Sequence, residues 1–158
     1  MRIRKRRLYW DSNCFIALFN SEPTTSRAQL DALQGTFEEM LGGHVKIITS
    51  DLYRVEVFGQ KNDPQANAIA EQLEACPDFE MVSLRTQAHQ MAGEMRERCR
   101  AAKRRLETAD ALHVAAATLA KADEMWTTEP KLVNRYQEGL LTSVKVCFPY
   151  LTQLKIPF

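Results

Sequence analysis

The sequence lacks any run of about 18 apolar residues, the length that a membrane-spanning helix requires. Its cationic start leads into an apolar stretch that Asp11 and Asn13 interrupt, so it has no signal-peptide core. The four cysteines form no Cys-x-x-Cys pair, and the three histidines show no zinc-ligand spacing. These absences argue against a membrane protein, a disulfide scaffold and a zinc site. We therefore expect a cytoplasmic chain with reduced thiols.

The chain has 158 residues, the length of one ordinary domain, and its 45% hydrophobic content is enough to build a core. The net charge of +1 hides an uneven distribution, because residues 1–10 hold five basic residues and no acid. A second basic run follows at Arg96, Arg98, Arg100, Lys103, Arg104 and Arg105. These runs favour a polyanionic partner, although a basic N-terminal arm over residues 1–7 and a solvated helix face are the alternative interpretations.

Short apolar runs alternate with helical patterns along the chain. Strands are predicted at residues 8–10, 45–49, 79–84, 125–127 and 144–148. Helices are predicted at residues 14–19, 25–41, 86–106, 109–120 and 131–138, in a segment capped by Ser50, and from a polar turn at residues 62–64 to about residue 76. Thr108 is expected to cap the apolar helix 109–120. The alternation predicts a single α/β domain with a central parallel sheet of about five strands flanked by helices, in an order that the pattern does not give.

Four carboxylates stand where predicted strands end or where the following helices begin, namely Asp11, Glu56, Asp110 and Glu129. Ligands of open α/β sheets bind beyond the carboxyl ends of the strands, so we expect these side chains to converge there. Carboxylates near apolar sequence are costly to bury without a counter-charge, and a hard cation such as Mg²⁺ prefers oxygen ligands. The layout predicts that these four acids form a catalytic metal site.

Such a site suits phosphoryl chemistry. A bound divalent metal can lower the pKa of a water from about 16 towards 7 and stabilise charge on the leaving oxygen, so in-line attack on phosphorus needs no covalent nucleophile. Nearby polar side chains would orient the carboxylates or hold a phosphate oxygen. The candidates for this role are Ser12, Asn13, Thr127 and Thr128.

Four blocks of sequence carry a family resemblance. They are Leu-Tyr-Trp-Asp-Ser-Asn at residues 8–13, Thr-Ser-x5-Glu at 49–56, Thr-Ala-Asp-Ala-Leu-His-Val-Ala at 108–115 and Trp-Thr-Thr-Glu at 126–129. Together they resemble the blocks of PIN-domain ribonucleases, especially the VapC-type toxins of prokaryotic toxin–antitoxin pairs.

That resemblance implies a Rossmann-like PIN domain over residues 1–158 and Mg²⁺- or Mn²⁺-dependent endoribonuclease activity. It also implies an RNA substrate, a homodimer and a cognate antitoxin protein. Asp11, Glu56 and Asp110 match the family's three core acids, whereas Glu129 stands where the family usually has Asp.

Each acid also has an ordinary structural interpretation. Asp11 could end a strand, Asp110 could complement a helix N-terminus, and Glu56 could be a partly solvated residue paired with Arg54 or Gln60. Glu129 before Pro130 is typical of a helix N-terminal acid. His113 is interpreted as a satisfied residue of a packed helix, outside the site.

Two other functions remain beside the toxin hypothesis. One is a catalytically weakened RNA- or protein-binding module that kept the fold, and the other is a non-toxin RNA-processing nuclease. Phosphoryl-transfer domains of the receiver or aspartyl-phosphate phosphatase kind are disfavoured. Trp10 precedes Asp11, so the receiver's acid pair is absent, and Asp11-Ser12-Asn13 lacks the phosphatase's second Asp.

Overall fold

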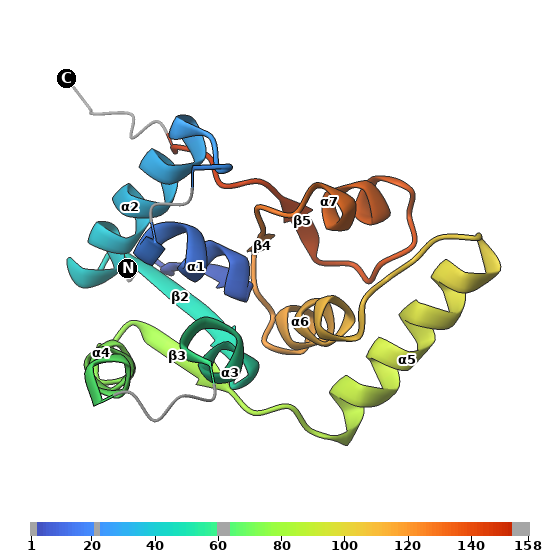
Figure 1. Cartoon of the computed structure of the whole chain (residues 1–158), viewed down its shortest axis with the longest axis horizontal. Helices are drawn as coiled ribbons and strands as arrows, with labels where there is room; N and C mark the ends of the chain where they lie inside the picture. The colour runs from blue at the N-terminus through green and yellow to red at the C-terminus, as the bar shows by residue number, and fades with distance from the viewer. Residues whose placement is uncertain (1–2, 21–22, 60–63, 153–158) are drawn as a thin grey trace.

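The computed structural model describes residues 3–20, 23–59 and 64–152, which form one α/β domain around a sheet of five parallel strands. The strands are β1 (Arg6–Trp10), β2 (Val45–Ser50), β3 (Phe79–Val82), β4 (Glu124–Trp126) and β5 (Lys145–Cys147). Their spatial order is β3-β2-β1-β4-β5 (Figure 1). The predicted fold class is confirmed, and the order places β1 at the centre of the sheet.

Helices cover both faces of this sheet (Figure 1). They are α1 (Ser12–Asn20), α2 (Arg27–Leu41), α3 (Leu52–Phe58), α4 (Pro64–Glu74), α5 (Thr86–Ala101), α6 (Thr108–Leu119) and α7 (Pro130–Gln137). Within the described ranges, no helix is both long and apolar enough to cross a bilayer.

Alternation along the central strands builds a separate core on each face. Leu8 and Trp10 of β1 pack with residues of α1 to α4, whereas Tyr9 between them packs with residues of α5, α6 and α7. Ile47 and Ile48 of β2 divide in the same way. Helix α6 is buried along most of its length, as its apolar, alanine-rich sequence predicts.

Three local predictions need correction. Helix α5 ends at Ala101 rather than at residue 106, because Lys103 adopts a left-handed φ of 57° and the Arg104 N–H bonds back to the Cys99 carbonyl at 2.8 Å. Ser50 is the last residue of β2, and Asp51 is the N-cap of α3. Thr108 is the first residue of α6, whose N-cap is Glu107. Asn62 and Asp63 of the predicted polar turn lie outside the described residues.

The basic N-terminal segment is paired with acids at the amino ends of the strands. Arg6 and Arg7 begin β1. The four ion pairs are Arg4–Asp123 at 2.9 Å, Lys5–Asp78 at 2.8 Å, Arg6–Glu124, and Arg7–Glu80 at 3.4 Å. Residues 4–7 therefore fasten β1 to the starts of β3 and β4, while residues 1 and 2 of the expected arm lie outside the described part.

Candidate active site

Asp11 lies between the end of β1 and the start of α1, where it is 2% exposed. Its backbone N–H donates to the Trp126 carbonyl at 3.2 Å, which joins it to the end of β4. One carboxylate oxygen accepts the Cys14 N–H at 3.2 Å and the other accepts the Thr127 hydroxyl. Burial raises the pKa of Asp11, and the nearby His113 imidazole and the Thr127 hydrogen bond only partly oppose this shift.

Thr127 is itself held in position. Its hydroxyl oxygen accepts the backbone N–H of Glu129 at 3.1 Å while its hydrogen is directed to Asp11. A threonine at the end of β4 thus connects the first acid to the last one. This contact matches the orienting role expected for Thr127.

Glu56 on α3 is fixed by a buried network that reaches across the sheet edge. His113 Nε2 lies 2.7 Å from Glu56 Oε1, and the Ser12 hydroxyl donates to the same oxygen at 2.8 Å. Because a carboxylate only accepts, Nε2 donates in this contact, and Nδ1 on the other side of the ring lies 2.7 Å from the Tyr9 hydroxyl oxygen. Within the described residues, no hydrogen bond engages the other oxygen, Oε2.

The same contacts decide the charge of Glu56. Burial opposes ionisation, but the hydrogen bond and electrostatic attraction from His113, together with the hydrogen bond from Ser12, outweigh it and lower the pKa of the carboxyl. Arg54, one of the two partners considered for Glu56, bonds Glu74 instead, and Gln60, the other, lies outside the described residues. Glu56 is therefore an ionised carboxylate whose position is set from α6 and α1.

His113 is the residue that sequence reasoning left out of the site. It is 1% exposed and contacts the hydroxyls of Tyr9, Ser12 and Ser50 as well as Glu56. A polar interruption in an otherwise apolar, buried helix was the available signal, since such a group needs buried partners. Its partners come from four other elements, β1, α1, β2 and α3, which sequence spacing alone does not reveal.

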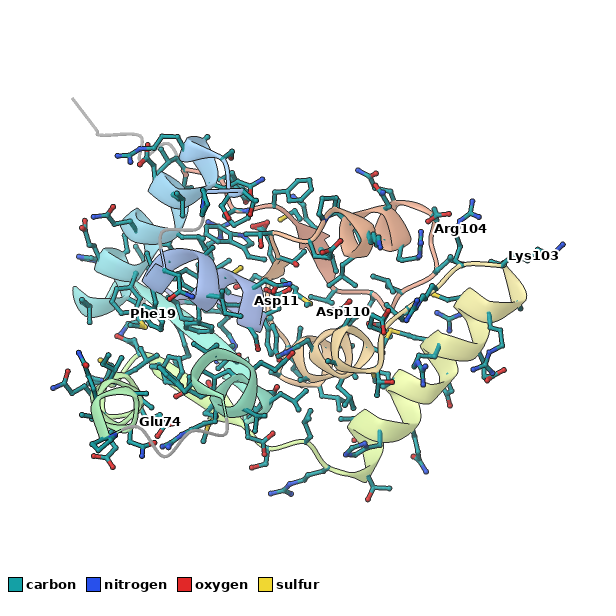
Figure 2. All side chains as sticks on the ribbon, viewed as in Figure 1. Asp11, Phe19, Glu74, Lys103, Arg104 and Asp110 are labelled. Atoms are coloured by element: carbon teal, nitrogen blue, oxygen red, sulfur yellow. The ribbon has the colours of Figure 1, made fainter. Side chains whose placement is uncertain are left out.

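Asp110 in the first turn of α6 differs from the other acids. Among the described residues, none donates a hydrogen bond to it or forms an ion pair with it. Burial, followed by repulsion from Asp11, Glu129 and Glu56, raises the pKa of Asp110 to about 6. The four predicted acids therefore influence one another electrostatically, and Figure 2 shows Asp11 and Asp110 where α1 and α6 come together.

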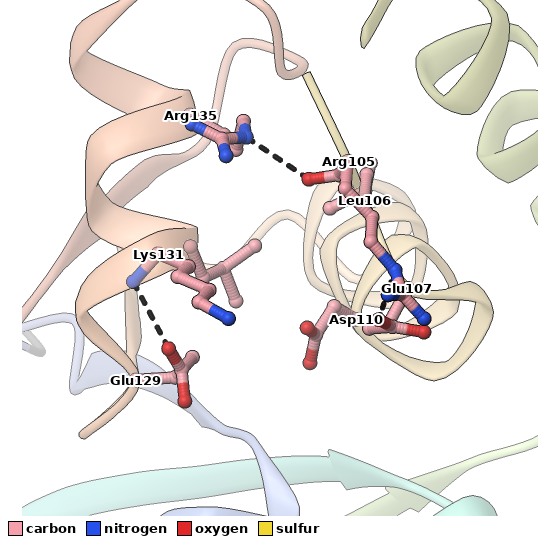
Figure 3. A pocket seen from close by; sticks show the side chains of 8 residues that line it. Arg105, Leu106, Glu107, Asp110, Glu129, Lys131 and Arg135 are labelled. Atoms are coloured by element: carbon pink, nitrogen blue, oxygen red, sulfur yellow. Dashed lines mark hydrogen bonds and ion pairs between the residues drawn. The ribbon is translucent and has the colours of Figure 1, made fainter. Parts of the chain in front are cut away.

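Glu129 has two structural roles, because it caps a helix and also lines a pocket. It is the N-cap of α7, with Oε1 accepting the Lys131 N–H at 3.1 Å, so the interpretation as a helix N-terminal acid is correct. It also lines, with Asp110, a pocket of about 210 Å³ between α7 and the start of α6 (Figure 3). This hydrogen bond orients the Glu129 side chain towards the first turn of α7.

The other two polar candidates have different surroundings. Ser12 donates to Glu56, as an orienting residue would. In the described structure, Asn13 and Thr128 make no hydrogen bond to the four acids, and they line a second pocket on the other side of Glu129.

The donor set fits a hard divalent cation. Asp11, Glu56 and Glu129 are oriented by hydrogen bonds, and the ionised form of Asp110 is disfavoured by burial and by its acidic neighbours. No described Lys or Arg forms an ion pair with any of the four. No three described acidic, histidine or cysteine side chains are drawn together tightly enough to form a complete ligand cage. Mg²⁺ does not require such a cage, because it typically keeps several waters and takes one or two carboxylates plus substrate phosphates.

The sequence matches the PIN domain family over residues 8–136. No curated protein gives a significant match.

Several solved structures share the fold. A chain of VapBC-1 from nontypeable Haemophilus influenzae aligns with a TM-score of 0.65 at 16% identity, covering 90% of this chain and 97% of that one. A chain of a toxin–antitoxin complex from Klebsiella pneumoniae gives 0.62 at 18%, covering 92% and 99%. VapC20 from Mycobacterium tuberculosis, a sarcin-ricin loop cleaving toxin, gives 0.58 at 13%, covering 87% and 98%.

Proposed function

Because the chain belongs to the PIN-domain family, we propose that it is a Mg²⁺- or Mn²⁺-dependent endoribonuclease and the toxin of a toxin–antitoxin pair. The observation that carries the proposal is a group of acids without a described Lys or Arg partner, in which Asp11 and Glu56 are held by hydrogen bonds from Thr127 and His113. Burial and repulsion from the other three acids raise the pKa of Asp110 to about 6. A divalent cation would relieve this repulsion and would be bridged to substrate by phosphate oxygens.

Each acid has a proposed part in holding the ion. Asp11, Glu56 and Asp110 would supply the carboxylate oxygens, with Glu56 offering Oε2 because His113 and Ser12 occupy Oε1. Glu129 would act mainly through a water, since Oε1 already caps α7. When bound, such an ion lowers the pKa of water and stabilises charge on a phosphodiester in the transition state.

The toxin role is supported by the proteins that share the fold. Structures of VapBC and FitAB complexes from several bacteria and VapC20 are among them. By this likeness the proposed partners are RNA as substrate, a cognate antitoxin protein and a second copy of the chain. The proposed site of action is the cytoplasm.

Cleavage assays test the enzymatic part directly. The wild-type protein should cut single-stranded RNA in Mg²⁺ or Mn²⁺ and lose this activity in EDTA. Asp11→Asn and Asp110→Asn should each lower the rate by about a thousandfold or more, because each removes a charge that positions the ion. Circular dichroism of the variants controls for folding, and undiminished cleavage by both variants contradicts the proposal.

One observation favours the binding-module alternative, namely the use of Glu129 as a helix cap where the family usually has Asp. A weakened module would bind RNA with the same affinity in EDTA and in Mn²⁺ and would not cut it. Expression in bacteria separates toxin from RNA-processing nuclease, because only a toxin should arrest growth in a manner that Asp11→Asn abolishes.

A further inference from the structure

Glu129 lies on the border of two pockets with different chemistry. The charged pocket, of about 210 Å³, is lined by three basic residues, Arg105, Lys131 and Arg135, and by three acids, Glu107, Asp110 and Glu129. The neutral pocket, of about 460 Å³, is lined by Asn13, Thr24, Thr25, Ser26, Gln29, Thr128, Glu129, Pro130 and Phe148. A strand that passes Glu129 would therefore meet basic side chains interspersed with acids in one pocket and uncharged hydrogen-bonding groups in the other.

Among the three basic residues of the charged pocket, Lys131 is the one that forms no ion pair within the described structure. Figure 3 shows its side chain extending from α7 into the space that Asp110 faces. Arg105 already pairs with Glu107 at 2.7 Å, and Arg135 pairs with Glu138 at 2.6 Å. No described carboxylate lies within ion-pair distance of the Lys131 ammonium.

The rim of this pocket is held in shape by the backbone. The Arg135 guanidinium donates through Nε to the carbonyl oxygen of Arg105 at 3.0 Å, which ties α7 to the connection between α5 and α6. Lys131 lies one helical turn before Arg135, on the same side of α7. An anion bound by Lys131 would lie near Asp110 and Glu129, in a pocket whose other side is the connection that Arg135 holds in place.

The neutral pocket has the features of a nucleoside site. Of the nine residues that line it, Glu129 alone is charged, and the others supply amides, hydroxyls and the ring of Phe148. The side chain of Asn13 makes no hydrogen bond within the described structure, so its donor and acceptor are both available. Unpaired RNA bases are bound by such amide groups and by contact with aromatic rings.

We propose that an RNA strand crosses the site in one orientation, with a phosphate beside the cleaved one bound by Lys131 and an unpaired nucleoside bound in the neutral pocket. This inference rests on the proposed nuclease function and names its substrate subsites. The reverse placement is unfavourable, because it would leave a phosphate among uncharged groups and Lys131 without an anion.

The experiment separates phosphate contacts from base contacts. Fluorescence anisotropy in EDTA measures the affinity for four single-stranded RNA homopolymers over a range of salt concentrations. Lys131→Met should weaken all four to the same extent and reduce the slope of log K against log salt by about 0.7, the value for one phosphate contact. Lys121→Met, which changes an exposed lysine beyond the far end of α6, is the matched control and should leave the slope unchanged.

Asn13→Ala should leave the salt slope unchanged and alter the affinity ratios among the four RNAs by about fivefold or more. Gln29→Ala on α2 repeats this test from a second helix, in case Asn13→Ala disturbs α1. An unchanged slope in Lys131→Met, or unchanged ratios in both neutral-pocket variants, overturns the proposal. Absence of metal-dependent cleavage by the wild type would instead refute the nuclease function, so the two failures are distinguishable.

Discussion

The two edges of the sheet carry acids in opposite circumstances. At the amino ends of the strands, each of four acids has a basic partner from the N-terminal segment, as in the Lys5–Asp78 pair at 2.8 Å. At the carboxyl ends, Asp11, Glu56, Asp110 and Glu129 form no ion pair with a described Lys or Arg, and burial together with repulsion from the other three acids raises the pKa of Asp110 to about 6. The acids at the amino ends of the strands are neutralised by basic partners. The acids at the carboxyl ends lack such partners among the described residues, so a bound cation would neutralise their negative charge.

The largest expected effect concerns the amino ends of the strands, where each acid is paired with a basic residue. Arg6 bonds the buried Glu124 and stacks on the rings of Trp126 and Tyr150, with centroid distances of 5.8 and 5.2 Å. Arg6→Met should lower the free energy of unfolding by about 2 to 3 kcal/mol, because the largely buried Glu124 then keeps only the more distant Lys145, at 3.7 Å, as a cationic partner. Chemical denaturation measures this loss, and Mn²⁺ affinity should not change. A large drop in Mn²⁺ affinity would show that the edges are not independent.

His113 tests how the acidic edge is positioned. His113→Met removes the donor to Glu56 Oε1 at similar volume and should weaken Mn²⁺ binding by about 10- to 100-fold, the usual cost of losing a group that orients a ligand. His113→Gln, which keeps a donor near the position of Nε2, should restore most of the affinity. Calorimetric titration measures both variants. In a Glu56→Gln background, His113→Met should reduce Mn²⁺ affinity much less. An undiminished loss of affinity would mean that His113 does not act through Glu56.

Asp110 tests the charge imbalance itself. Its folded pKa of about 6 exceeds the ordinary value of 3.8, so protonation of Asp110 favours the folded state below pH 4, and this contribution is lost as the pH rises to about 6. Without metal at pH 7.5, Asp110→Asn should therefore raise the free energy of unfolding by about 1 to 2 kcal/mol, after allowance for partial exposure of the side chain.

The pH dependence provides the control for Asp110→Asn. Near pH 4 the variant and the wild type should have nearly equal stability, because the wild-type carboxyl is then protonated. A variant that is less stable than the wild type at both pH values would contradict the assignment of repulsion to Asp110.

Glu129 should show the smallest effect. Glu129→Gln keeps a side-chain oxygen that can cap α7 and should reduce Mn²⁺ affinity by less than tenfold if the residue acts through water. Glu129→Ala should also cost about 1 kcal/mol of stability through loss of the cap. Titration and denaturation of the two variants separate these effects, and a hundredfold loss of affinity in Glu129→Gln would identify direct ligation.

Much of this organisation was predictable from local sequence. The positions of the strands followed from short apolar runs, and the alternation of strand and helix indicated that Asp11 follows a strand and that Asp110 lies at the start of a helix. The early end of α5 was not predictable in this way, because Lys103 adopts its left-handed φ without the usual glycine. Strand order depends on which neighbours pair, which periodicity along one strand does not encode.

The finer organisation of the site depended on contacts between distant segments. Ser12 and His113 meet at Glu56 although they lie on α1 and α6, so neither motif alone indicates the network. Likewise, the basic N-terminal residues read as an arm because the acids that pair with them, such as Asp78 and Asp123, are more than 70 residues away in sequence.

The most direct test of the central claim is the free energy of unfolding measured at pH 7.5 as Mn²⁺ is added. If the acids at the carboxyl edge bind the ion, the wild type should gain stability with concentration, reaching about 2.7 kcal/mol at one hundred times the dissociation constant, and Asp11→Asn should gain almost none. A wild type that Mn²⁺ does not stabilise, or an equal gain in Asp11→Asn, would contradict a metal site at this edge.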